Sequence, residues 1–454
     1  MRDKVSVAEQ WVERIVAVEL ASLPPAVRET CERLLVDVTG LCIAARSSDY
    51  VRAALMAWPE PGPATAIGHA RPLSAAGAAF VNGTAAHGED FDDTFEGGPV
   101  HAGAVIVPAV LAAAEQEGLD GAAVLRGLAV GVEAICRLST VVPKALHKAG
   151  FHPTAVLGTM AATASVGAAL GLNQKQLSDA LGVAGSMAGG IIEYLADGSW
   201  TKRMHPGWAA QSGLRAALLG RAGFTGPRTV LEGTHGLFQG FAHTREGNWG
   251  ALLDGFGEGW LAETLAFKPY PCGTMVQPYI DCARRLTARG VVPEDIVAMA
   301  CQVGEGTVHR LWEPLAQKQR PPNGYAAKFS TPYCIAYGIL HGTLGLEAFT
   351  DAAVADDRVR GLAAKVSYVV DPANPYPNAF TGHIRATLRD GRVIEERQPH
   401  LRGGASEPLS RPELEAKFAA NARLGGWSEA QAGSALALIR SLWGARIDLA
   451  ILRA

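Results

Sequence analysis

Phe267-Lys268-Pro269-Tyr270-Pro271-Cys272-Gly273 divides the sequence into two parts with different patterns. Before this stretch, residues 5–57 and 75–219 are dominated by apolar residues at helical spacing. After it come the strand-like segment 296–303 and a later pair of strands around the turn Arg389-Asp390-Gly391-Arg392, which is a strong hairpin signal. The break therefore predicts a large helical domain followed by a smaller α+β domain.

The domain boundaries follow from this break. We expect residues 1–266 to form the helical domain, with the tail 401–454 packing back on it, and residues 267–400 to form an α+β lid domain. The fold class is thus mainly α with an α+β second domain. In the second domain, the proline-rich segment 314–322 predicts a loop. The helices predicted in the first domain after residue 57 cover 75–87, 104–116, 121–138, 153–170, 174–188 and 207–222.

The composition is that of a folded protein without an excess of positive charge. Hydrophobic residues make up 48% of the 454 residues, which is enough for sizeable cores and argues against a disordered chain. The formal net charge is −3, so we expect neither nucleic acid nor a membrane as a partner. The seven cysteines are scattered without a CxxC spacing, which favours reduced thiols and no zinc or iron–sulfur cluster.

Two further patterns concern localisation and cofactors. The first residues of the chain are charged and lack the apolar core of a signal peptide, which predicts a cytoplasmic protein. Residues 149–174 contain no charged side chain, but they are mostly small and too weakly hydrophobic for a membrane span, so we expect a buried helix. Neither a Walker phosphate loop nor a GxGxxG turn after a strand is present, so nucleotide use is not indicated.

The densest polar motif is His87-Gly88-Glu89-Asp90-Phe91-Asp92-Asp93-Thr94, which is followed by His101. Carboxylates and histidines beside apolar helices are costly unless they are paired, coordinate a ligand or face water. The residues alone leave three interpretations open. The motif is a divalent metal site built from its carboxylates, an acid–base site, or a helix-capping loop with solvated acids.

Two later motifs add imidazole and positive charge. His152 precedes Pro153 at a predicted helix start, where the positive helix end favours a neutral imidazole. Lys202, Arg203 and His205 lie in a predicted loop just before a helix, an arrangement suited to binding carboxylates. Each motif also has a plain structural interpretation, as a histidine at a helix start and as a solvated basic loop.

The last two candidate residues lie in the second part of the chain. Two prolines and a glycine hold Lys268 on a stiff turn at the domain junction, where ligand sites are common, although a solvated hinge lysine fits the pattern equally well. Tyr333 lies near another helix start. It is either a proton donor or a core aromatic residue, and the sequence alone favours the core.

Five motifs occur in a fixed order along the chain: HGEDFDDT (87–94), GFHPTAVLG (150–158), TKRMHPGWAA (201–210), FKPYPCG (267–273) and KFSTPY (328–333). As an ordered set they resemble the MmgE/PrpD superfamily, which includes 2-methylcitrate dehydratase, cis-aconitate decarboxylase and iminodisuccinate epimerase. The resemblance implies a large helical domain with a smaller α+β lid domain, usually as a homodimer, and an active site in the cleft between the domains. No cofactor and no metal are expected, in keeping with the cysteine spacing.

The resemblance also assigns residues, position by position. The expected catalytic residues are His152 as the leading proton-transfer group, His101 as its partner, Asp90 as an orienting carboxylate and Tyr333 as a proton donor. The expected substrate-binding residues are Lys202, Lys268 and Thr94, with Arg203 and His205 added from the basic motif. Lys202 and Lys268, with Arg203, would hold the carboxylates of the substrate and stabilise an enolate-like transition state.

The reaction expected from this site is proton abstraction from a small di- or tricarboxylate. Dehydration of a 2-methylcitrate-like hydroxy acid is the leading prediction. Epimerisation of a substituted succinate and decarboxylation of a cis-aconitate-type acid are the alternatives, because the same carbanion can lead to each product. The length of the chain and the turn 267–273 resemble the shorter, epimerase-like members of the superfamily.

Overall fold

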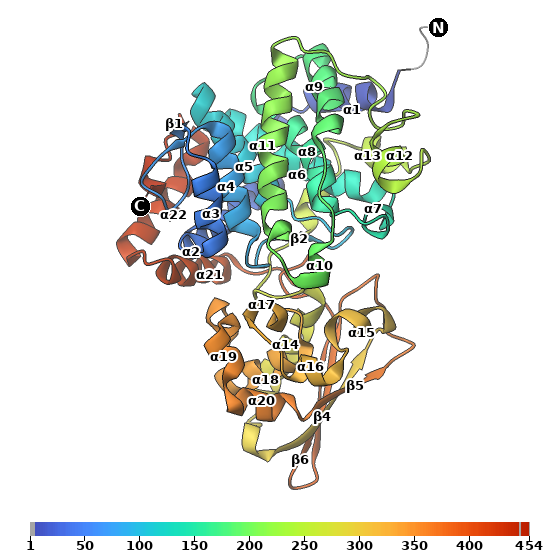
Figure 1. Ribbon diagram of the computed structural model, residues 1–454, viewed down its shortest axis with the longest axis vertical. Coiled ribbons are helices and arrows are strands. Elements are labelled where there is room, and N and C mark those ends of the chain that lie inside the picture. The colour runs from blue at the N-terminus through green and yellow to red at the C-terminus, as the bar shows by residue number, and fades with distance from the viewer. Residues whose placement is uncertain (1–4, 445, 454) are drawn as a thin grey trace. The chain divides into compact units, whose positions relative to one another are not determined.

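The protein is described here by a computed structural model, which covers residues 5–444 and 446–453. The chain folds into two compact units (Figure 1). Unit 1 comprises Met1–Gly88, Asp92–Leu265 and Ser410–Ala454, and unit 2 comprises Glu89–Phe91 and Ala266–Leu409. Unit 1 is mostly helical and unit 2 combines helices with a small sheet, so the predicted fold class is confirmed.

Unit 1 is built from helices connected by short segments. Its helices are α1 (Val7–Val16), α2 (Pro25–Ala45), α3 (Asp49–Ala57), α4 (Ala75–His87), α5 (Gly103–Glu117), α6 (Gly121–Val141), α7 (Ala145–Lys148), α8 (Pro153–Ala169), α9 (Gln174–Met187), α10 (Tyr194–Asp197), α11 (Thr201–Arg221), α12 (Leu237–Ala242), α13 (Trp249–Leu253), α21 (Arg411–Leu424) and α22 (Glu429–Ser441). Its short strands are β1 (Pro61–Ala64) and β2 (Thr94–Phe95), and β3 (Leu265–Ala266) lies where the chain passes from unit 1 to unit 2.

The centre of unit 1 is α8, which packs against α6 on one side and α11 on another (Figure 1). Every residue of α8 is buried, and most of them are Ala, Gly, Thr, Ser or Val. A helix that is apolar on all sides must be surrounded by other elements, and small side chains let those neighbours approach closely. The uncharged segment 149–174 is thus a core helix with its flanking turns, as predicted. Among the residues that the structure describes, no helix has the length and apolar character needed to cross a bilayer.

Two helices of unit 1, α4 and α11, approach each other closely at Gly83 and Gly207. A Cβ atom added at Gly207 would lie 2.1 Å from the carbonyl oxygen of Phe80, and one at Gly83 would lie 2.6 Å from Cα of Gly207. Neither helix has room for a side chain at the crossing. The crossing matters for the chemistry because α4 ends at His87 and α11 carries His205.

We expect Gly207→Ala to lower the free energy of unfolding by about 1–3 kcal/mol, because the new methyl group meets a backbone carbonyl that cannot rotate away. Urea unfolding followed by circular dichroism measures this. Gly433→Ala in α22 is the matched control, because a Cβ atom there meets nothing within 4 Å. The steric interpretation is wrong if the two variants have equal stability.

Unit 2 contains a four-stranded sheet in the order β5-β4-β6-β7. Its strands are β4 (Ile296–Val303), β5 (Val366–Val370), β6 (Gly382–Leu388) and β7 (Val393–Gln398), and its helices are α14 (Gln277–Ala288), α15 (Glu305–Leu311), α16 (Leu315–Gln319), α17 (Gly324–Ala327), α18 (Thr331–His341), α19 (Asp351–Ala355) and α20 (Asp357–Ala363). β4 pairs parallel with β5, from Met299 opposite Val366 to Val303 opposite Val370, and antiparallel with β6. β6 and β7 form the predicted hairpin.

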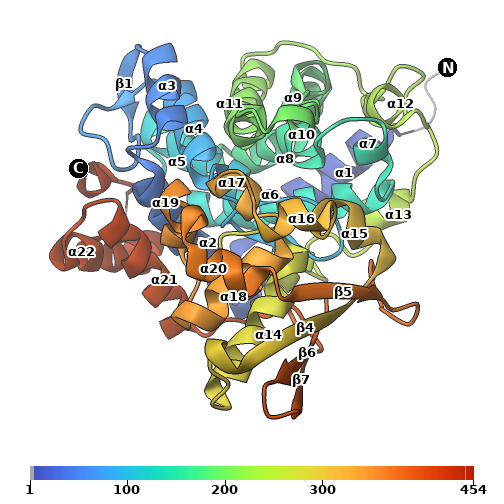
Figure 2. The ribbon, with the colours of Figure 1, turned by 60° about the horizontal axis from the view of Figure 1, so that its bottom comes forward.

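The core of unit 2 lies between this sheet and its helices. α14 packs on β6 and β7, and α18 packs on α14 and α20 (Figure 2). Met299, Cys301 and Val303 of β4 are buried, whereas Ala300 and Gln302 between them are partly exposed, so one face of the strand is covered and the other is more open. This alternation matches the period of two that a half-buried strand requires.

Two predictions of secondary structure were wrong. The segment 314–322 was predicted to be a loop, but it contains the short helix α16. α11 begins at Thr201 rather than at residue 207, so Lys202, Arg203 and His205 lie on the helix and not in a preceding loop. Pro206 lies inside α11, where it removes the backbone donor that would reach the carbonyl of Lys202.

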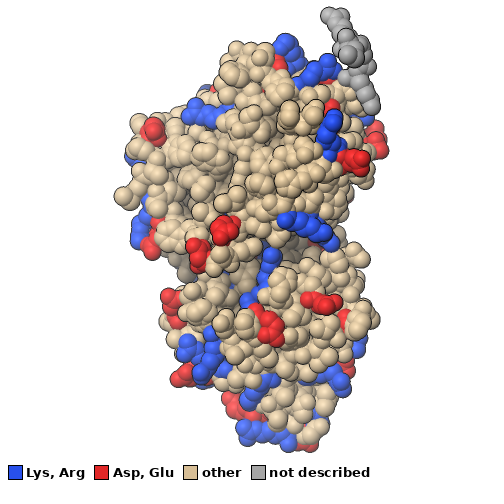
Figure 3. Space-filling view, turned by 45° about the vertical axis from the view of Figure 1, so that its right-hand side comes forward, with Lys and Arg blue, Asp and Glu red and all other residues tan. Residues whose placement is uncertain are grey.

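Charges of both signs are interspersed on the face of the molecule shown in Figure 3. In unit 2, Arg285 and Arg289 both contact Glu396 of β7, with nitrogen–oxygen distances of 3.1 and 2.6 Å.

All seven cysteines are free and buried. Desolvation raises the pKa of Cys31 to about 12, so this thiol stays protonated and chemically quiet at neutral pH.

Candidate active site

The site is built around Asp92 of unit 1, which contacts imidazoles on both sides. His87 is the last residue of α4, and its Nδ1 lies 2.7 Å from Oδ2 of Asp92. Nδ1 of His101 lies 3.5 Å from the same oxygen. The side chains of His87 and Asp92 have no exposed surface. A buried carboxylate that accepts from an imidazole fixes both the tautomer and the orientation of the ring.

The carboxylate of Asp93 stabilises the start of α5 instead. Its carboxylate accepts hydrogen bonds from the backbone N–H groups of Ala102 and Gly103, at 2.9 and 2.8 Å. Its carbonyl oxygen lies 2.7 Å from Nδ1 of His101. Burial, together with the nearby charge of Asp92, raises the pKa of Asp93 to about 8 although the two backbone bonds act in the opposite direction. Asp93 therefore places His101 through the backbone as well as through the helix start.

His152 occupies the N-cap position of α8. Its backbone N–H donates to the carbonyl of Gly190 at 2.8 Å, and Ile192 donates back to the carbonyl of Gly150 at 3.0 Å. Gly190 has a φ of +127°, a conformation that strongly favours glycine, and a Cβ atom there would lie 2.5 Å from Cβ of Ala155. The segment around Gly190 is therefore the support that holds His152 in place.

The second turn of α11 brings His205, the fourth imidazole of the cluster, to His152. Nδ1 of His152 and Nδ1 of His205 are 3.1 Å apart, so one ring donates and the other accepts. Tyr194 of α10 faces both rings, with ring centroids 6.2 Å from His152 and 5.9 Å from His205. This group of aromatic rings closes one side of the cluster.

Burial and neighbouring positive charge keep two of these imidazoles neutral. Desolvation, followed by the other histidines and the Lys202 ammonium, lowers the pKa of His152 well below its usual 6.5. Desolvation is again the largest cause for His205, and together with His87 and Lys202 it lowers that pKa to about 4. Both imidazoles are therefore uncharged at neutral pH and are ready to accept a proton.

The same electrostatic coupling shows where Lys202 acts. Its positive charge affects both His152 and His205, so the ammonium belongs to the environment of this cluster. The next residue, Arg203, is placed differently. Its guanidinium lies 4.5 Å from the ring centroid of Tyr50, in a cation–π contact. Of the three predicted basic residues, Lys202 and His205 are thus associated with His152, whereas Arg203 packs on Tyr50.

In unit 2, two buried lysines hold the short segment Glu89–Phe91. Lys268 donates from Nζ to the carbonyl oxygen of Asp90 at 3.0 Å. Lys328 donates to the carbonyl of Glu89 at 2.9 Å, and its Nζ lies 3.1 Å from the Glu89 carboxylate. Asp90 has a φ of +54°, which is uncommon for a residue other than glycine and tolerated best by Asp and Asn. The residues on either side, Gly88 and Asp92, belong to unit 1. The three residues Glu89–Phe91 are therefore the part of the acidic motif that belongs to unit 2.

Tyr333 is the predicted site residue that has the most evident structural role. Its side chain is fully buried in the core of unit 2, and its hydroxyl donates to the carbonyl of Ala348 at 2.5 Å. Burial raises the pKa of Tyr333 above its usual value. A phenol that is already bound to a backbone carbonyl and hard to ionise is a core residue, so we do not keep Tyr333 as a proton donor.

The predicted residues occur in both units. His101, His152, Lys202 and His205 belong to the cluster in unit 1, and Thr94 is buried in β2 directly after Asp93. Asp90 and Lys268 contact each other in unit 2. The sequence interpretation missed His87 as a member of the cluster, Asp92 as the orienting carboxylate and Tyr194 as a neighbouring ring. The acidic motif signalled the first two, whereas a tyrosine on a short helix carries no signal.

A helical domain with a buried imidazole cluster, followed by an α+β domain, defines a class of protein that matches known families. The family model of the MmgE/PrpD N-terminal domain matches residues 9–249, and that of the MmgE/PrpD C-terminal domain matches residues 270–439. The chain belongs to the MmgE/PrpD family.

Three relatives have names that denote lyases. Cis-aconitate decarboxylase of Mus musculus is 31% identical over 358 residues, which cover 76% of this chain and 71% of that protein. Cis-aconitate decarboxylase of Aspergillus terreus is 28% identical over 402 residues, 82% of this chain and 81% of that protein. 2-Methylcitrate dehydratase of Cupriavidus necator is 25% identical over 259 residues, 53% of this chain and 51% of that protein. The family and its named members identify this protein as an enzyme of the lyase type.

Proposed function

We propose that this protein is a lyase that removes carbon dioxide from a small unsaturated tricarboxylate of the cis-aconitate type. The observation that carries the proposal is the cluster of His87, His101, His152 and His205 around the buried Asp92 carboxylate. The choice of decarboxylation rests on the relatives. The matches to decarboxylases extend over 76% and 82% of this chain, against 53% for a dehydratase.

Decarboxylation places two demands on such a site. When the carbon–carbon bond to the departing carboxylate breaks, its electron pair stays on carbon and spreads into the neighbouring double bond. A cation must stabilise this charge beside the carboxylates that remain, and the Lys202 ammonium is the candidate. A proton must then be delivered to carbon. We assign this step to the protonated form of His152, which takes up a proton from water before the reaction and whose ring is paired with His205. The carboxylates of the bound substrate favour this form, because negative charge near an imidazole raises its pKa.

A second candidate function is dehydration of a hydroxy acid of the 2-methylcitrate type, which is the leading prediction from the sequence. The lowered pKa of His152 favours it, because a neutral imidazole is a base that can take a proton from carbon while hydroxide leaves. The match to a 2-methylcitrate dehydratase is consistent with this chemistry. We place dehydration second because that match covers a smaller share of this chain.

The experiment is incubation of the purified protein with cis-aconitate, 2-methylcitrate, citrate and substituted succinates, each in deuterated water, with the products followed by NMR. We expect cis-aconitate to lose one carboxylate and to gain one deuterium on carbon. Loss of water from a hydroxy acid without loss of carbon dioxide would support the second candidate instead. Deuterium exchange without net conversion would indicate an epimerase, and no reaction with any of these acids would refute the polycarboxylate proposal.

A further inference from the structure

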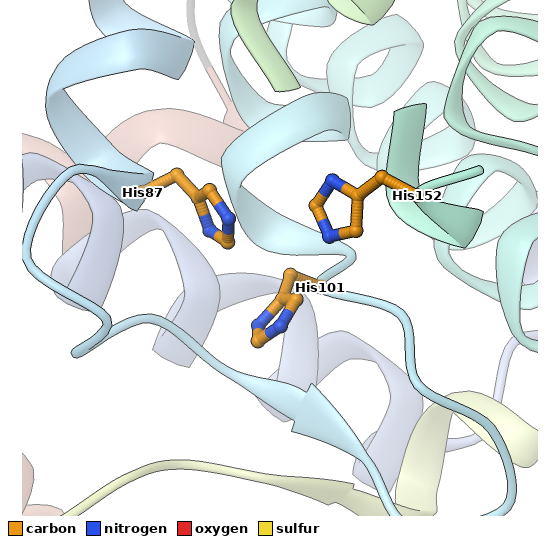
Figure 4. A group of neighbouring side chains, drawn as sticks. All are labelled: His87, His101 and His152. Carbon is orange, nitrogen blue, oxygen red and sulfur yellow. The ribbon is translucent and has the colours of Figure 1, made fainter. Parts of the chain in front are cut away.

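Three imidazoles of the cluster surround one common space, to which α4, the segment before α5 and the start of α8 each contribute a ring (Figure 4). Each of His87, His101 and His152 offers one ring nitrogen, and these nitrogens all lie within 4.8 Å of one another. We propose that these three residues bind a divalent transition-metal ion such as Zn²⁺, and that the bound ion inhibits the enzyme.

The hydrogen bonds at the back of the rings prepare them for this role. Nδ1 of His87 faces the Asp92 carboxylate at 2.7 Å, and Nδ1 of His101 faces the carbonyl of Asp93 at 2.7 Å. With Asp92 ionised, both partners can only accept a hydrogen bond, so both rings carry their proton on Nδ1. Their Nε2 atoms then present lone pairs, which is the tautomer that a metal ligand needs.

His152 is compatible with the same arrangement. Its Nδ1 is paired with Nδ1 of His205 at 3.1 Å, which leaves its Nε2 as the nitrogen for a ligand. Nε2 of His87 is buried and has no hydrogen-bond partner among the described residues. An unpaired nitrogen of this kind is costly to bury, and a metal ion would satisfy it.

The partners behind the rings have the form that is found around metal sites in proteins. Ligating histidines usually donate their other ring N–H to a carboxylate or a backbone carbonyl, which orients the ring and increases the basicity of the ligand. Here Asp92 is the carboxylate and Asp93 provides the carbonyl. Imidazole nitrogen is a preferred ligand of Zn²⁺, Cu²⁺ and Ni²⁺, whereas Mg²⁺ and Ca²⁺ prefer oxygen, so the ion is of the first group.

The geometry is that of an open site rather than a closed structural one. Zinc–nitrogen bonds of about 2.0–2.1 Å in a tetrahedral site place the nitrogens about 3.3 Å apart, so nitrogens that are up to 4.8 Å apart must approach by as much as about 1.5 Å on binding. Three protein ligands leave a fourth position for water or a substrate carboxylate. The positive charge of Lys202 near this cluster lowers the affinity for a cation, so we expect reversible binding.

Inhibition follows from the lone pairs that the ion would use, and this part of the proposal rests on the proposed function. A histidine that transfers a proton must have one nitrogen free to accept or donate it. Once Nε2 of His152 is bound to a metal ion, that nitrogen can no longer exchange a proton with the substrate. The binding of the ion, by contrast, depends only on the positions of the three imidazoles.

Titration of untagged, chelator-treated protein with Co²⁺ tests the binding. We expect about one Co²⁺ per chain, with visible absorption bands of a nitrogen-coordinated ion that disappear when Zn²⁺ is added. His87→Gln should abolish these bands, and Asp92→Asn should weaken binding by about 10–100-fold because it removes the carboxylate behind a ligand. His235→Gln, at an exposed histidine outside the cluster, should bind Co²⁺ like the wild type. Circular dichroism of each variant verifies that it is folded.

The outcomes separate the two parts of the proposal. Absence of the bands at saturating Co²⁺, or equal bands in folded His87→Gln, refutes the metal site whatever the enzyme catalyses. If the wild type binds Co²⁺ and turns over cis-aconitate, Zn²⁺ should inhibit turnover at the concentration that displaces Co²⁺, and a chelator should restore it. Unchanged or increased turnover at full occupancy refutes inhibition while the site stands. Metal binding without turnover of any tested acid refutes the proposed function alone.

Discussion

His152→Gln is expected to lower kcat by at least about a hundredfold, within the roughly 10²–10⁴-fold range that general acid–base catalysis contributes. Glutamine has a similar length and can still form a hydrogen bond with His205, but its amide cannot exchange a proton at neutral pH. The helix start at α8 does not depend on the imidazole, because the backbone N–H of residue 152 donates to the carbonyl of Gly190. The loss should therefore reflect chemistry rather than unfolding.

The pH dependence of kcat/KM provides a second measurement on the same residue. Burial and neighbouring charges lower the pKa of His152 below 6.5, so the neutral imidazole persists on the acid side of that value. The ratio kcat/KM reports groups of the free enzyme. If His152 donates its proton in decarboxylation, kcat/KM should fall as the pH rises through the lowered pKa, whereas if His152 is the base of a dehydration, kcat/KM should fall as the pH drops through it. Both cases place the His152 limb of the profile on the acid side of pH 6.5, and we refer to it as the acid limb. His235→Gln should have wild-type kinetics. Near-full activity of His152→Gln, or an acid limb centred above pH 6.5, would contradict the assignment.

Lys202→Met is expected to lower kcat by about 10²–10³-fold, which is the effect of removing one group that stabilises developing negative charge. Lys202 lies in the first turn of α11 and is partly exposed, so methionine can replace the alkyl chain without a cavity. The ammonium also lowers the pKa of His152 and His205. Its removal should therefore raise both pKa values and move the acid limb of kcat/KM to higher pH.

This shift distinguishes an electrostatic role from a structural one. Lys175→Met is the matched control, because Lys175 is an exposed lysine that pairs with Asp179 on α9. Lys202→Arg keeps the charge, so it should leave the acid limb in place even if its different shape reduces kcat. A Lys202→Met enzyme with unchanged kcat and an unchanged pH profile would remove this lysine from the site.

Several parts of the fold could be predicted because local patterns dictate them. α4 has the predicted bounds, since Ser74 caps its start with a side-chain bond to Gly77. The hairpin of β6 and β7 follows from the turn 389–392. A helix cap and a tight turn depend on residues that are neighbours in the sequence. They can therefore be predicted without knowledge of the tertiary structure. The start of α11 could not be predicted in this way, because a proline is usually read as the end of a helix.

The site shows the same division at the level of side chains. Motif order and residue type predicted the fold class and the family, and they made His101, His152 and Lys202 candidates for the site. The packing of the helices was needed to show that Asp92 contacts two of the imidazoles and that Tyr333 is a core residue. The reason is that an ionisable side chain acquires its role from its partners and its burial. Residues far apart in the chain supply both, and they meet only when the helices pack.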